Sequence, residues 1–126
     1  MGESTVRSVA AQTVAKGDVL GTARFAGAHA ATETASLLAL GSTVRVRSTT
    51  VEFTFASDGI DIEVTVESDE ELGATSAAFS AATAAALTIY DMCKSADRTM
   101  VIGPVRLAAR SRSNEGSDDA GRGVTL

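Results

Sequence analysis

Residues 44–67, VRVRSTTVEFTFASDGIDIEVTVE, decide the fold that this sequence predicts. In the second half, every other residue is aliphatic: Ile60, Ile62, Val64 and Val66. This alternation is typical of a β-strand with one buried face. The first half alternates in the same way, with one slip near Ser48 that indicates a β-bulge. Ser-Asp-Gly at 57–59 is a hairpin turn signal, so the stretch predicts a two-stranded antiparallel hairpin.

Two alanine-rich segments flank this hairpin, and their small and apolar residues recur at helical spacing. The first is predicted to be one helix over residues 19–40, with Asp18 as its N-terminal cap and Gly41 as its C-terminal glycine. The second is predicted to be a helix over residues 74–96. Alanine has the best helix propensity, and its small side chain lets helix backbones approach closely.

Two further segments complete the expected fold. Residues 8–14, SVAAQTV, and residues 100–110, MVIGPVRLAAR, are predicted to be strands. The element order is then strand, helix, strand, strand, helix, strand, which predicts an α+β, ferredoxin-like (split βαβ) domain. Such a domain has a four-stranded antiparallel sheet with both helices on one face. We expect one domain over residues 1–110 and a disordered tail over residues 111–126, where few residues are apolar.

The composition narrows the possible functions. The chain has 126 residues and a net charge of −5, which argues against general nucleic-acid binding. No apolar run reaches the ~20 residues that a membrane-spanning helix needs, and no signal peptide is recognisable. Cys93 is the only cysteine, so the sequence predicts neither an internal disulfide nor a zinc site, and favours a cytoplasmic protein.

The segment ALTIYDMCK, residues 86–94, gathers polar groups at the end of the second helix. Asp91 and Lys94 share a helix face, which is typical either of a surface ion pair or of a carboxylate and an ammonium held beside a substrate. Lys16 precedes a helix N-terminus, where it is either an exposed loop residue or part of an anion site. Cys93 is expected to be buried, and His29 to be an ordinary helix residue rather than a ligand.

Two stretches resemble a known family. KGDVLGTARFAGAHAA at residues 16–31, and AALTIYDMCK at 85–94 followed by MVIGPVRLAARS at 100–111, are similar to the MoaC family of cyclic pyranopterin monophosphate synthases of molybdenum cofactor biosynthesis. The resemblance runs from about residue 4 to residue 111.

This resemblance implies a lyase. The family converts a cyclic dihydroguanosine triphosphate to cyclic pyranopterin monophosphate and releases pyrophosphate, with acid–base groups and phosphate-binding cations and without a cofactor or metal. It implies dimers that assemble as a trimer of dimers, with active sites at the dimer interface, and a guanosine-triphosphate-derived small molecule as the partner. Asp91, Lys94 and Lys16 match catalytic residues. Arg7, Lys16 and Lys94 match phosphate-binding residues.

The sequence departs from the family pattern at several positions. Ser42 stands where the family has histidine, and Thr75 and Ala77 stand where it has glutamate. None of these side chains replaces a lost acid–base group, because serine, threonine and alanine do not titrate near neutral pH. The family's N-terminal element would lie before Met1. The alternative is therefore a weakly active or inactive MoaC-like protein that acts as a ligand-binding or oligomeric scaffold.

Overall fold

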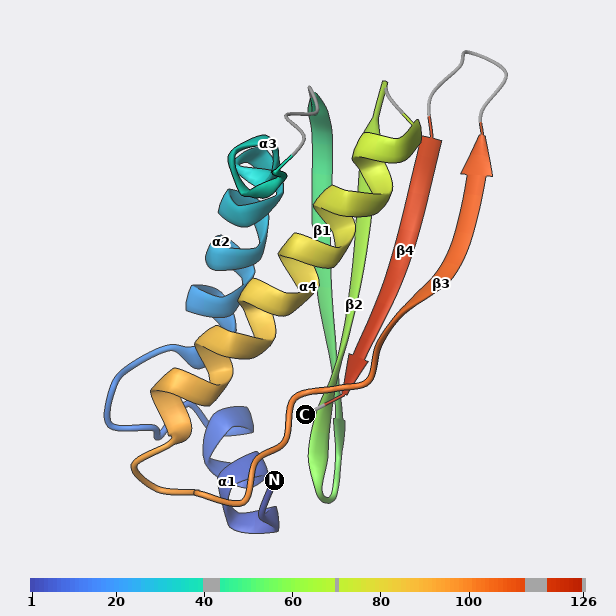
Figure 1. The fold of residues 1–126 in the computed structure, drawn as a ribbon. Coiled ribbons are helices and arrows are strands. Elements are labelled where there is room, and N and C mark those ends of the chain that lie inside the picture. Colours follow the sequence, from blue (N-terminus) through green and yellow to red (C-terminus); the bar gives the residue numbers. More distant parts are fainter. Residues whose placement is uncertain (40–43, 70, 113–117, 126) are drawn as a thin grey trace.

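The structure is a computed structural model that describes residues 1–39, 44–69, 71–112 and 118–125. Its helices are α1 (Glu3–Ala10), α2 (Val19–Thr32), α3 (Thr34–Leu37) and α4 (Glu71–Cys93). Its strands are β1 (Val46–Ala56), β2 (Gly59–Ser68), β3 (Val105–Arg112) and β4 (Asp118–Thr125). The strands pair antiparallel in the order β1-β2-β4-β3, and α2 and α4 cover one face of the sheet (Figure 1). The predicted α+β class is confirmed.

The β1–β2 hairpin forms as its alternation predicts. Val51 lies opposite Val64 and Phe53 opposite Ile62, so apolar side chains share the face that packs against the helices. The register shifts between Val46 and Ser48, which confirms the predicted bulge. Both glutamates of the pair Glu52 and Glu63 are exposed on the opposite face of the sheet.

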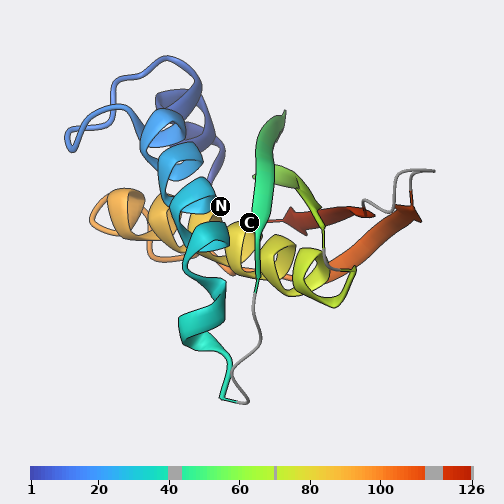
Figure 2. The same ribbon diagram turned by 90° about the horizontal axis from the view of Figure 1, so that it is seen from above.

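α2 and α4 pack directly against each other on one face of the sheet (Figure 2), and small residues permit their close approach. Ala23, Gly27 and Ala31 recur every four residues on α2 and are buried. A Cβ atom on Gly27 would lie 3.1 Å from the backbone oxygen of Ala81 in α4 and 3.2 Å from Cγ2 of Val51 in β1. Glycine is therefore the residue that permits this approach, and the alanine-rich sequence of α4 forms much of the core.

The N-terminal segment is a helix, so the prediction of a strand over residues 8–14 was wrong. Residues 3–10 form α1, and its buried side chains Thr5, Val6 and Val9 lie on one helical face. The chain then turns at Gln12, whose φ is 58°. The two valines of the predicted strand belong to different structures, because Val9 ends a helical stripe and Val14 lies beyond the turn.

The predicted helix over residues 19–40 is shorter and interrupted. Asp18 caps α2 as predicted, since its Oδ1 accepts a hydrogen bond of 3.0 Å from the Gly21 amide. The helix stops at Thr32, and α3 follows from Thr34. Both threonine hydroxyls donate to backbone carbonyls of α2, which offers the chain an alternative to a continuous helix. Leu40 and the predicted terminal Gly41 lie outside the described residues.

The predicted second helix is confirmed as α4, although it begins and ends three residues earlier than expected. The strand predicted over residues 100–110 forms later, as β3, and the Gly103–Pro104 peptide bond before it is cis. Residues 118–125 were assigned to a tail by the sequence analysis. In the structure they form β4, whose backbone pairs with both β2 and β3. Among the described residues, no helix is long and apolar enough to cross a membrane.

Candidate functional site

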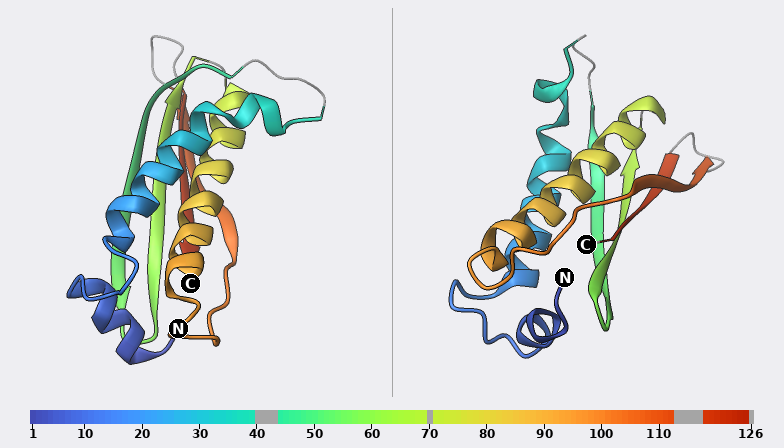
Figure 3. Two further views of the ribbon diagram at one scale, coloured as in Figure 1. Left: turned by 90° about the vertical axis from the view of Figure 1, so that its left-hand side faces the viewer. Right: turned by 60° about the horizontal axis from the view of Figure 1, so that its bottom comes forward.

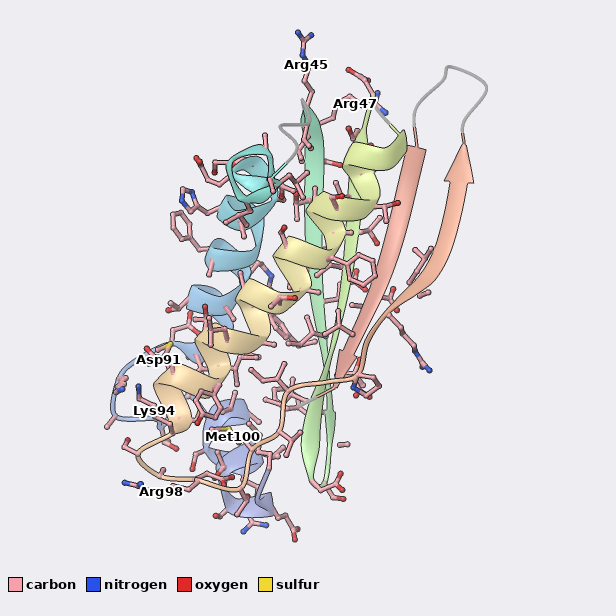
Figure 4. All side chains as sticks on the ribbon, viewed as in Figure 1. Arg45, Arg47, Asp91, Lys94, Arg98 and Met100 are labelled. Atoms are coloured by element: carbon pink, nitrogen blue, oxygen red, sulfur yellow. The ribbon has the colours of Figure 1, made fainter. Side chains whose placement is uncertain are left out.

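The end of α4 holds the polar groups that the sequence analysis selected. The last turn of α4 exposes Asp91 and is followed by Lys94, and the Lys94 Nζ lies 2.8 Å from Asp91 Oδ1. The two side chains remain 61% and 52% exposed, so they form a pair that solvent and ligands can reach. Figure 4 shows them at the same end of the molecule, where α4 meets the loop that follows it.

Lys16 joins this pair through the backbone. Its Nζ donates a hydrogen bond of 3.0 Å to the carbonyl oxygen of Asp91. The last carbonyls of a helix have no partner within the helix and carry partial negative charge, so a lysine there is favourable. Lys16 therefore contacts the C-terminal end of α4. An anion site at the N-terminal end of α2 was the alternative for Lys16, but there the carboxylate of Asp18 accepts a hydrogen bond from the Gly21 amide.

Asp91 and Lys94 reinforce each other's charged states. The Lys94 ammonium, through its hydrogen bond and its charge, lowers the pKa of Asp91, and Lys16 lowers it further. Asp91 in turn raises the pKa of Lys94. Lys94 is therefore a permanent cation near neutral pH, suited to hold a phosphate or to stabilise developing negative charge. Asp91 orients it and remains ionised.

Arg7 lies apart from this cluster in the structure. Its guanidinium forms an ion pair of 3.1 Å with Glu3 one turn earlier on α1, and both side chains are about two-thirds exposed. Among the described residues, Arg7 forms no hydrogen bond or ion pair with Asp91, Lys94 or Lys16. The structure thus brings together three of the four sequence-predicted site residues.

Two of the positions that differ from the family pattern, Thr75 and Ala77, lie at the other end of α4. Ala77 is fully buried in the hydrophobic core, where a glutamate would lose its hydration, while Thr75 is half-buried. Ser42 lies outside the described residues. The α4 position at which the family pattern has a glutamate is thus an apolar core position in this chain, Ala77. This difference is relevant to whether the chain acts as an enzyme or as a scaffold.

The predicted burial of Cys93 is confirmed, and His29 lies on α2. Cys93 is 1% exposed, and burial, with a smaller contribution from the charge of Asp97, raises the pKa of its thiol. A cavity of about 190 Å³ lies between α1, the loop at residues 13–16 and the end of α4, and Cys93 lines it with Lys16. His29 is exposed on α2 and stacks on Phe25 with ring centroids 6.2 Å apart. Within the described ranges, no three His, Cys, Asp or Glu residues are grouped to hold a metal ion.

Asp97 and Arg98 were not predicted from the sequence. Asp97 is 7% exposed, and its Oδ2 accepts a hydrogen bond of 2.7 Å from the Gly2 amide. This bond fixes the loop after α4 to the N-terminus of the chain, which lies close to that loop (Figure 3). The Oδ1 of Asp97 accepts from the backbone amide and the hydroxyl of Thr99 at 2.8 and 2.6 Å. Arg98 projects outward beside Lys94 (Figure 4). Helical spacing gave no signal for Arg98, because α4 ends at Cys93 and Arg98 lies in the loop beyond it.

Comparisons with known proteins place the chain in a family. Residues 1–113 match the sequence profile of the MoaC family. The chain is 44% identical over 103 residues to the cyclic pyranopterin monophosphate synthase of Chloroflexus aurantiacus. The aligned region covers 80% of this chain and 63% of that relative. It is 39% identical over 118 residues to the enzyme of the same name from Chloroflexus aggregans, with 92% of this chain and 72% of the relative covered.

A third relative of the same name, from a Thermoanaerobacter species, is 36% identical over 118 residues. The aligned region covers 92% of this chain and 75% of that relative. The fold and site define an α+β protein with an antiparallel sheet and a cluster of carboxylate and ammonium groups at the end of its longest helix. The chain belongs to the MoaC family. It spans less than two thirds of the length of the first Chloroflexus relative.

Proposed function

We propose that this chain is a cyclic pyranopterin monophosphate synthase-type lyase of molybdenum cofactor biosynthesis. It converts a cyclic dihydroguanosine triphosphate to cyclic pyranopterin monophosphate and releases pyrophosphate. The single observation that carries the proposal is the cluster of Lys16, Asp91 and Lys94 at the end of α4, with Nζ contacts of 3.0 and 2.8 Å. The relatives reported above are cyclic pyranopterin monophosphate synthases, which supports the choice of reaction.

In this reaction the two lysines bind and stabilise the anionic substrate. Lys94, held charged by Asp91, contacts a phosphate or an oxyanion that develops as the ring system is rebuilt. Lys16 contributes a second cation, and Asp91 fixes the direction of Lys94. Arg7 is also proposed to contact a phosphate of the substrate, although it lies apart from the lysines. To do so, its guanidinium must break its ion pair with Glu3.

The proposal includes a ferredoxin-like fold and a cytoplasmic homo-oligomer, a dimer that assembles as a trimer of dimers. Large apolar side chains on the surface support assembly: Phe25 is 73% exposed, Leu87 56% and Val101 71%. The one cysteine, which forms no disulfide, supports a reducing compartment. Size in solution tests the assembly, and a strict monomer contradicts an active site that is completed by a second subunit.

The test of the reaction is direct. The purified chain is incubated with the cyclic dihydroguanosine triphosphate, and pyrophosphate and the pyranopterin product are measured. Lys94→Ala and Lys16→Ala are each expected to lower the rate by about 100-fold or more, as loss of a transition-state contact does. Arg47→Ala is the matched control, because Arg47 pairs with Asp69 at 3.3 Å at the opposite end of the molecule.

A second function is supported by a specific observation. Ala77 lies in the core, where the family pattern has glutamate, which favours a MoaC-like scaffold that binds a phosphorylated ligand without turnover. The same assay separates the two functions. Absence of product at high protein concentration, together with ligand binding that Lys94→Ala abolishes, identifies the scaffold.

A further inference from the structure

A cleft beside Lys94 is also lined by a second cationic side chain, Arg98, which the family resemblance did not select. The cleft has a volume of about 320 Å³ and is lined by Tyr90, Lys94, Ser95 and Arg98. Two cationic and two hydroxyl side chains therefore share one depression. This set of donors is what an anion with several oxygens requires.

Arg98 is free to take a ligand. Elsewhere in the described chain, Arg7 pairs with Glu3 and Arg47 with Asp69, whereas Arg98 forms no ion pair with any described residue. Its side chain extends outward from the loop after α4, on the same side as Lys94 (Figure 4). The loop itself is fixed, since the neighbouring Asp97 is buried and accepts hydrogen bonds from Gly2 and Thr99.

A second groove of different chemistry adjoins this cleft. It has a volume of about 460 Å³, and Tyr90 and Lys94 belong to both depressions. Its other lining residues lie on α2 and α4: Thr22, Leu87, Thr88, Asp91 and Met92. Aliphatic and aromatic surfaces with a few polar groups are typical of sites for a flat heterocycle. Lys94 stands where the two depressions meet.

We propose that Arg98 and Lys94, with the hydroxyls of Ser95 and Tyr90, form a polyphosphate-binding subsite, and that the adjoining groove holds the heterocycle of the same ligand. The assignment of one ligand to both depressions rests on the proposed function. The guanidinium of Arg98 binds two phosphate oxygens at once, whereas the ammonium of Lys94 acts as a point charge near the bond to the ring portion. Arg98 is thus a substrate-orienting residue.

The experiment measures binding of inorganic pyrophosphate to the full chain by calorimetry at fixed ionic strength. Arg98→Ala is expected to weaken binding by about 10-fold to 100-fold, the effect of removing a charge-assisted bidentate contact, and Arg98→Lys by less. Arg47→Ala removes the same charge from an exposed arginine at the far end of the protein and is expected to change binding by less than about twofold. Circular dichroism confirms that the variants fold.

Two results overturn the proposal: wild-type protein that does not bind pyrophosphate at millimolar concentration, or Arg98→Ala that binds it as Arg47→Ala does. Binding of unphosphorylated guanosine is a second probe, and Arg98→Ala must leave it unchanged. Turnover of the cyclic dihydroguanosine triphosphate is measured separately. Turnover without an effect of Arg98→Ala refutes the subsite alone, whereas Arg98-dependent pyrophosphate binding without turnover refutes the proposed reaction alone.

Discussion

The carboxylate of Asp97 provides a prediction whose size follows from its contacts. It lies between Lys94 and Arg98 in sequence and ties the loop that carries them to the N-terminus of the chain. We consider Asp97→Asn, which keeps the side-chain volume. The change removes the charge and replaces one acceptor oxygen with an NH2 group, so one of the donors at 2.6–2.8 Å loses its partner.

A hydrogen bond to a charged group contributes about 1.5–3 kcal/mol, against about 0.5–1.5 kcal/mol for a neutral one. Loss of one such bond and weakening of the remaining two is expected to lower the free energy of unfolding by about 2–4 kcal/mol. Urea denaturation followed by circular dichroism at about pH 7 measures this difference. Asp58→Asn is the control, because Asp58 is an exposed carboxylate in the hairpin turn.

The effect depends on pH with a definite sign. Hydrogen bonds from the Thr99 hydroxyl and from the amides of Gly2 and Thr99 hold the pKa of Asp97 below its ordinary value. A group whose pKa is depressed in the folded state stabilises that state above the unfolded pKa, about 3.9, and this contribution is lost as the pH falls below it. The difference in the free energy of unfolding between the wild type and Asp97→Asn is therefore expected to shrink below about pH 4.

The reasoning is refuted if Asp97→Asn unfolds at the same urea concentration as Asp58→Asn at neutral pH. It is also refuted if the gap stays constant into the acid range, since a loss independent of protonation would not come from the charge of Asp97. A gap that narrows as the pH falls is the expected result.

Three further predictions concern packing, the sheet surface and the thiol. Gly27→Leu is expected to destabilise the protein by about 1–3 kcal/mol or more in thermal unfolding, because a side chain there meets α4 and β1 at 3.1–3.2 Å from its Cβ. Glu52→Lys is expected to stabilise the hairpin by about 0.2–1 kcal/mol by relieving repulsion with Glu63, and the gain must fall as salt is added. Cys93 is expected to react with maleimide slowly in the native protein and rapidly in urea, because burial hides the thiol and raises its pKa.

The site was predictable only in part. Asp91 and Lys94 share a helix face at a spacing of three, and their contact follows from helix geometry alone. The contact of Lys16 with the carbonyl of Asp91 joins residues 75 apart in sequence, so no local pattern encodes it. Arg98 follows the end of α4, and its place beside Lys94 depends on how Asp97 fixes the loop.

The sequence by itself determined the elements whose patterns are long and regular. The alternation over the hairpin specified both strands, their turn and the bulge, since a slip of one residue would turn every aliphatic side chain to the solvent. The alanine content of α4 specified a helix, although not its ends. Asp18 was recognisable as a cap because its interaction is local.

Only the tertiary structure decided the elements whose partners are distant. Residues 3–10 form a helix because Thr5, Val6 and Val9 pack on one side, although the strand prediction began inside that segment. Residues 118–125 form a strand through backbone pairing with β2 and β3, which their side-chain sequence does not announce. The same distinction applies to the site residues. Local helical spacing places Asp91 next to Lys94. The positions of Lys16 and Arg98 depend on long-range packing, because contacts between distant segments form only once the core has closed.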